Sequence, residues 1–191
     1  MAAQSRPTTT PHGQPDESPD EGRMVGLFWM DRDGCWLGAP AGADGTGVRL
    51  TDEGLTPVGA PASGTLGWAG IERVGVPDAP ARSGLRRGLR TAIDVATSMA
   101  GFGGPDSGHR MTVSVTHAGG QSEFAVLSAA APAYTEREVE LSHRVLARFA
   151  AGELRPSALM DWWRSAGFRS GPKPQEREAV LERLLLTPAG P

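Results

Sequence analysis

The residues of this chain that could do chemistry are four histidines and one cysteine, and they lie far apart: His12, Cys35, His109, His117 and His143. His109 and His117 bracket a predicted strand, so a metal ion bound by both would need two or more further ligands brought in by folding. A single cysteine excludes a disulfide within one chain and a cysteine-rich metal site. Cys35 has no readable basic partner, which is typical of a small buried hydrophobic residue. We therefore expect ordinary surface histidines, an inert thiol, no metal and no cofactor.

The sequence motifs of common enzymes are also missing. There is no Gly-x-Ser-x-Gly elbow of the kind that carries a nucleophilic serine. The glycine-rich stretch 101–104 lacks the Lys-Ser/Thr ending of a phosphate loop and follows a predicted helix rather than a strand. The formal charge of −3 and the pI near 5.8 carry no signature of a polyanion binder. We expect a protein that is not an enzyme and does not bind nucleic acid.

The first 22 residues predict a disordered tail. They combine Pro, Thr, Ser and Gln with the acidic run 16–21 and show no apolar periodicity. The stretch lacks the apolar run of a secretory signal, and no window of the chain approaches 18 uninterrupted apolar residues. With one cysteine in the whole chain, these features favour a cytoplasmic location.

The ordered part begins with short strands joined by turn residues. Residues 24–30 are apolar on both faces and predict one strand that is buried on both sides. Turns at 31–34 and 51–54 predict two hairpins, and a break near 69–70 predicts a bulge or tight turn. Alternation over 111–127 around a glycine turn predicts a last hairpin.

The stretch 135–152 is the best-defined predicted helix. Thr135 is an N-cap candidate and Glu138 stands three residues later, which is the pattern of a capping box. Leu141, Val145 and Phe149 recur every four residues and form one apolar stripe. A helix with this stripe must pack on the predicted strands.

Three further segments predict helices. Residues 83–101 predict an amphipathic helix inserted between strands, with several arginines off its apolar face. Beyond the helix at 135–152, two helices are expected, one starting near Pro156 or Ser157 and one over 175–186, joined by a Pro/Gly linker at 170–174. We therefore divide the chain into a tail (1–22), one domain (23–152) and a C-terminal helical extension (153–191).

The order of short strands followed by a capped amphipathic helix resembles the pleckstrin-homology-like (PH-like) domain family, of bacterial type. The residues that carry the resemblance are the strand pair around 48–55, the stretches 68–71 and 73–76, the hairpin 111–127 and the helix 135–151. The resemblance implies an α+β, mainly β fold: a bent, seven-stranded antiparallel barrel or sandwich with the inserted helix and a C-terminal capping helix. Two departures stand out, the inserted helix itself and the first turn 31–34, whose single Arg between two carboxylates is a poor polyphosphate site.

The remaining candidates for function are surfaces. Our leading hypothesis is a non-catalytic protein-protein interaction or scaffold module. Alternatives are weak contact with anionic membranes through the arginine-rich helix, and small-molecule binding at the barrel mouth. The candidate interaction residues lie on the inserted helix and the two C-terminal helices: Arg82, Arg86, Arg87, Arg90, Trp162, Trp163, Leu184 and Leu185.

Overall fold

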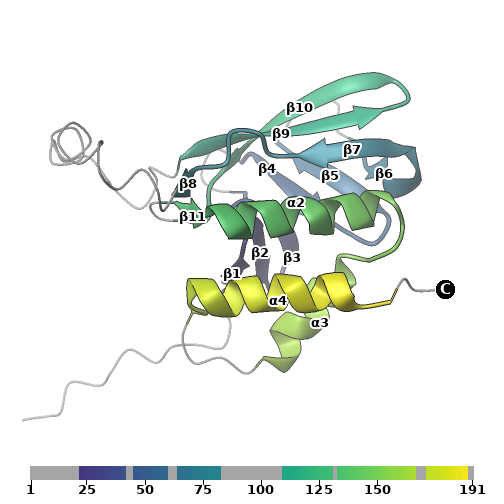
Figure 1. Ribbon diagram of the computed structural model, residues 1–191. Coiled ribbons are helices and arrows are strands. Elements are labelled where there is room, and N and C mark those ends of the chain that lie inside the picture. Colours follow the sequence, from purple (N-terminus) through teal and green to yellow (C-terminus); the bar gives the residue numbers. More distant parts are fainter. Residues whose placement is uncertain are drawn as a thin grey trace, which may run out of the picture.

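The computed structural model describes residues 22–41, 45–59, 64–82, 109–130, 133–166 and 171–188 (Figure 1). In these residues the chain is α+β and mainly β, with antiparallel sheets and three α-helices, as the sequence predicted at this coarse level. Nearly all of the predicted tail and the whole predicted inserted helix at 83–101 lie outside the described residues.

The larger sheet is a six-stranded antiparallel meander. Its strands follow one another in the chain: β1 (Arg23–Val25), β2 (Phe28–Asp31), β3 (Gly34–Leu37), β4 (Gly47–Leu50), β5 (Gly54–Val58) and β6 (Leu66–Gly67). The predicted hairpins β2–β3 and β4–β5 are confirmed.

The single strand predicted over 24–30 is wrong, because the chain folds back at Gly26 and forms the hairpin β1–β2. Gly26 has φ +55°, a conformation that side-chain-bearing residues rarely adopt. A side chain there would also collide with Ser142 Oγ, and the Leu27 N–H donates to that hydroxyl at 3.0 Å. The apolar residues on both sides of this stretch therefore reflect a buried turn beneath a helix.

The second sheet has three strands in the order β10–β9–β7, with β7 at Ile71–Gly75, β9 at Arg110–His117 and β10 at Gly120–Leu127. The predicted break near 69–70 is confirmed as a short 3₁₀ turn, η1 (Trp68–Gly70), which leads from β6 into β7. A two-residue parallel pair, β8 (Ala81–Arg82) with β11 (Tyr134–Thr135), was not predicted.

The described strands do not close into the barrel that the resemblance implied. The six-stranded and three-stranded sheets share no strand, and η1 separates them along the chain. At the end of β10, the Ala39 N–H donates to the Leu127 carbonyl at 2.7 Å, a single backbone contact that does not extend into a ladder. Within the described residues there is consequently no barrel mouth for a small molecule.

The predicted central helix is confirmed as α2 (Glu136–Ala150). The capping box is complete, with the Glu138 N–H bonded to Thr135 Oγ1 at 3.0 Å and the Thr135 N–H bonded to Glu138 Oε2 at 2.8 Å. The predicted stripe is fully buried, and Phe149 packs on Phe28 and on Trp68, at ring-centroid distances of 6.0 and 5.6 Å. Helix α2 thus joins the two sheets into one core.

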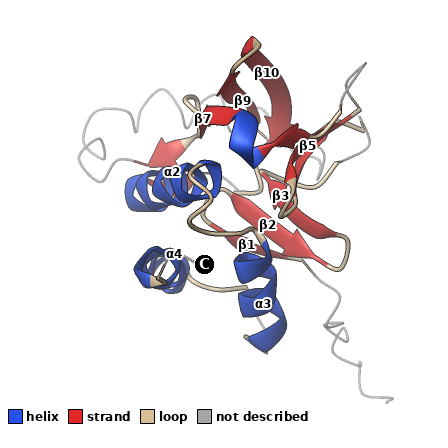
Figure 2. Cartoon of the chain, turned by 90° about the vertical axis from the view of Figure 1, so that its right-hand side faces the viewer, coloured by secondary structure: helices blue, strands red, loops and turns tan. Residues whose placement is uncertain are grey.

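Two C-terminal helices complete the fold, α3 (Ser157–Ser165) and α4 (Pro174–Leu186). Helix α4 packs on α2 and β1, whereas α3 packs on β2 and β3. Figure 2 shows α4 below α2 and α3 below β2. The sequence left open whether these helices dock, and the structure shows that they do.

His143 on α2 is half-buried and not the ordinary surface residue that the sequence suggested. Its Nε2 accepts the Val76 N–H at 3.0 Å, which ties α2 to the residue just after β7. Because Nε2 can accept only when it carries no proton, this bond requires the neutral ring.

We expect this contact to make stability pH-dependent. Burial lowers the pKa of His143, so the unfolded chain, whose His pKa is about 6.5, binds a proton at higher pH than the folded chain does. The neutral His143 side chain therefore contributes fully to stability above the unfolded-state pKa. This contribution is lost as the pH falls from the unfolded-state pKa towards the lower folded-state pKa. Urea denaturation from about pH 8 to about pH 5 should give a shallower fall for His143→Gln than for the wild type. If stability fell equally with pH in the wild type and in His143→Gln, the neutral His143 would not be the source of the pH dependence.

Candidate interaction surface

Helix α3 presents large apolar side chains that are only partly covered. Leu159 is fully buried, and Met160, Trp162 and Trp163 pack against the core while remaining partly exposed. The helix begins beside the β4–β5 turn, where Asp52 Oδ1 accepts the Ser157 N–H at 2.9 Å. That bond satisfies one of the free N–H groups of the first turn and fixes where α3 starts.

Helix α4 ends in three consecutive leucines, whose exposure differs because each residue turns the helix by about 100°. Leu184 is buried, Leu185 is partly buried, and Leu186 has 83% of its surface exposed. Val180, Leu181 and Leu184 therefore form the face that packs on the core. Leu184 and Leu185 were predicted from the sequence as interaction residues, and Leu186 was not. Because each residue turns the helix by about 100°, three consecutive leucines cannot all face the core, so an exposed leucine among them could have been expected.

We call Met160, Trp162 and Trp163 of α3 together with Leu185 and Leu186 of α4 the helical surface. Leu186 is the one large apolar side chain classed as exposed in the part of the chain that the structure describes. A single exposed apolar residue is normal on a protein, but here four further large apolar side chains on α3 and α4 are also only partly buried.

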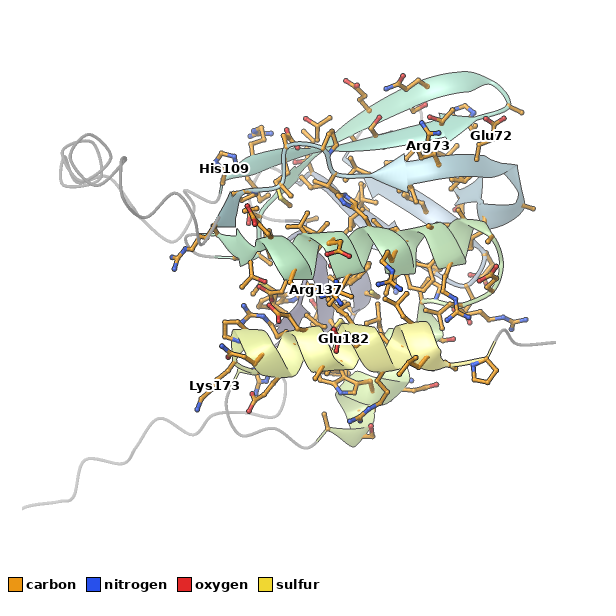
Figure 3. The ribbon with its side chains drawn as sticks, viewed as in Figure 1. Glu72, Arg73, His109, Arg137, Lys173 and Glu182 are labelled. Atoms are coloured by element: carbon orange, nitrogen blue, oxygen red, sulfur yellow. The ribbon has the colours of Figure 1, made fainter. Side chains whose placement is uncertain are left out.

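Hydrogen bonds and ion pairs from arginine side chains fix α4 on α2 along its length. At one end, Arg148 Nη1 donates to the carbonyls of Leu184 and Leu185, at 3.2 and 2.9 Å, and so satisfies C-terminal acceptors of α4. Midway, Arg137 on α2 and Glu182 on α4 point toward one another, 2.9 Å apart (Figure 3). These contacts fix α4, and with it Leu185 and Leu186, on α2.

At the other end of α4, Arg177 forms an ion pair with Glu138, whose side chain is fully buried. Arg177 also donates to the Pro172 carbonyl at 3.0 Å, and Glu138 accepts the Thr135 N–H. The carboxylate is thus shared between the cap of α2 and the start of α4. One buried charge therefore links two helix termini.

The arginine cluster can be placed only in part. Arg82 lies on β8 and is exposed. Arg86, Arg87 and Arg90 lie outside the described residues, so their proposed membrane contact stays a prediction. None of the described helices is long and apolar enough to cross a membrane.

One Ser–His pair has the residue types of a catalytic dyad but the wrong proton arrangement. His117 Nε2 lies 3.0 Å from Ser122 Oγ at the end of the β9–β10 hairpin. The Gly119 N–H donates to His117 Nδ1 at 3.1 Å, so Nδ1 carries no proton. In the neutral ring Nε2 then bears the hydrogen and donates to Ser122, which is the reverse of general-base activation.

Cys35 is buried as predicted, and burial raises the pKa of its thiol far above the usual range, with a smaller contribution from the charge of Asp31. Because the thiolate is the reactive form, we expect no labelling by a thiol reagent in native protein and complete labelling in denaturant. Labelling of the native chain at the denatured rate would show that β3 opens readily.

In the described residues, no group of three or more His, Cys, Asp or Glu side chains could hold a metal ion. His109 immediately precedes β9, and His117 is the last residue of that strand. Comparisons of the chain with protein-family models, with curated proteins and with solved structures found no match.

Proposed function

We propose that this chain is a non-catalytic protein-binding module and that the helical surface is where its partner docks. The observations that support the proposal are the exposure of Leu186 at the end of α4 and the partial exposure of Trp162 and Trp163 on α3. Aromatic and Met side chains are enriched in the buried centres of protein interfaces, and tryptophan is frequent among residues that dominate binding energy. A partner that covers this surface would remove apolar area from water.

The charges around the helical surface favour a protein partner over an anionic membrane. On α3, Arg164 pairs with Asp161 at 3.0 Å, and on α4, Glu182 and Arg183 lie side by side in the sequence. Binding to anionic lipid relies on an excess of cations, whereas protein interfaces carry a polar rim of mixed sign.

Site-specific photo-crosslinking in the cells that make the protein tests the proposal. A photoreactive phenylalanine analogue at position 186 should yield a discrete adduct with one other protein. The same analogue at position 123, an exposed site on β10, is the control and should yield none. Identical patterns at both positions, or no adduct at 186, would contradict the proposal.

A further inference from the structure

The outward face of β2, β3 and β4 carries a row of three large side chains. The strand register places Trp29 opposite Trp36 and Trp36 opposite Arg49. Their neighbours along the strands are buried in the core, and side chains alternate between the two faces of a sheet. Neither tryptophan belongs to the core cluster. We call Trp29, Trp36 and Arg49 the tryptophan face.

The tryptophan face contains an unsatisfied hydrogen-bond donor. Trp36 is 9% exposed, and its indole N–H has no partner in the part of the chain that the structure describes. The Trp29 indole, by contrast, donates to Asp31 Oδ2 at 3.2 Å. Leaving a buried donor unpaired costs about 1–3 kcal/mol, so the Trp36 N–H is a position where an acceptor is expected.

Arg49 supplies a positive charge at one end of the tryptophan face. Arg49 is exposed, and its guanidinium donates to the Asp33 carbonyl, which holds it beside the β2–β3 turn. Two indoles, one free indole N–H and one arginine suit an extended segment that contains proline and carboxylates. Proline rings pack on indole faces, a backbone carbonyl can accept the N–H, and a carboxylate can pair with the guanidinium.

The chain itself supplies a segment of this chemistry next to the tryptophan face. Residues 15–21 read Pro-Asp-Glu-Ser-Pro-Asp-Glu, with two prolines and four carboxylates. They lead into Gly22, which lies so close to the Trp29 indole that a side chain there would overlap the ring. An extended chain spans at most about 3.6 Å per residue, so Pro19 can lie about 10 Å from Gly22. Trp36 is only one strand spacing, about 4.8 Å, beyond Trp29.

We propose that the tryptophan face binds the chain's own acidic, proline-containing segment 15–21 through Trp29, Trp36 and Arg49. The segment would cover the partly exposed Trp29 indole and bring an acceptor to the Trp36 N–H. This inference is independent of the proposed function, because the helical surface lies on other elements.

Indole N–H resonances of the 191-residue chain test the proposal, because each of its five tryptophans contributes one such signal. Substituting Trp36 with Phe assigns the relevant signal. In the Pro15→Gly/Pro19→Gly variant we expect the Trp36 signal to shift and its proton to exchange with water roughly tenfold faster or more. Pro7→Gly/Pro11→Gly, which makes the same change outside the segment, should leave it unchanged. Trp68, packed on Phe149, reports whether the fold is intact.

A second test of the proposal reverses the charges of Arg49 and of the acidic segment. Arg49→Glu should shift the Trp36 signal as the proline variant does, and adding Asp20→Arg/Glu21→Arg to it should restore the wild-type position. A Trp36 signal that none of these variants moves would overturn the proposal. A shift that depends on protein concentration would also overturn it, because the segment would then bind a second copy of the chain.

Discussion

Replacing Val145 with aspartate is expected to abolish the cooperative thermal transition of the domain. Val145 is fully buried at the centre of the α2 stripe, between Leu141 and Phe149. A buried carboxylate without a partner costs several kcal/mol, which is a large part of the roughly 5–15 kcal/mol that holds a domain folded. Circular dichroism on heating measures the result.

Ala147→Asp is the matched control, because it introduces the same side chain on the exposed side of the same helix. Surface substitutions of this kind usually change stability by about 0.5 kcal/mol or less. A Val145→Asp variant with the wild-type transition would show that the stripe of α2 is not part of the core.

The second large effect is expected at Arg177. Arg177→Met leaves the fully buried Glu138 carboxylate without its counter-ion. Removing one partner of a buried pair costs about 3–5 kcal/mol. For a protein of this size that lowers the melting temperature by roughly 6–20 °C. Differential scanning calorimetry measures it directly.

Two variants separate the buried charge from the loss of packing. The double variant Glu138→Gln/Arg177→Met removes both charges and should recover part of the lost stability. Arg137→Met removes the exposed pairs with Glu140 and Glu182, and should lower stability much less than Arg177→Met because water screens both pairs. Equal losses for Arg137→Met and Arg177→Met would contradict the special role of the buried pair.

Local signals allowed much of the fold to be predicted. The capping box Thr135–Glu138 and the stripe of α2 depend on neighbours a few residues apart, so the sequence alone identified the helix and its buried face. The turns 31–34 and 51–54 were identified for the same reason, since short loops carry their own turn residues.

Features that depend on distant contacts could not be predicted. The turn at Gly26 is held by Ser142, more than 100 residues away in the sequence, and the apolar run around it looked like one strand. The β8–β11 pair joins two-residue segments that have no periodicity of their own. Two separate sheets and a closed barrel can share the same order of strands, so only the strand pairing distinguished them.

In the helical surface too, residue types could be predicted from the sequence, whereas features that depend on distant contacts could not. The tryptophans and leucines of the C-terminal helices could be identified by type, but their exposure depends on how α3 and α4 dock. Arg148 and Arg177 fix that docking through side chains that the sequence gave no reason to select. Leu186 emerged as the exposed residue only once α4 had been placed on α2.

The central claim, a protein partner on the helical surface, is tested most directly by quantitative co-purification with Leu186→Glu. Leu186 is exposed, so the fold should tolerate the change. Gln121→Glu is the control, because it adds the same charge at an exposed position on β10, in the three-stranded sheet. We expect the protein cross-linked at position 186 to be recovered about tenfold less with Leu186→Glu and unchanged with Gln121→Glu. Equal recovery of that protein by both variants would show that the helical surface is not where the partner binds.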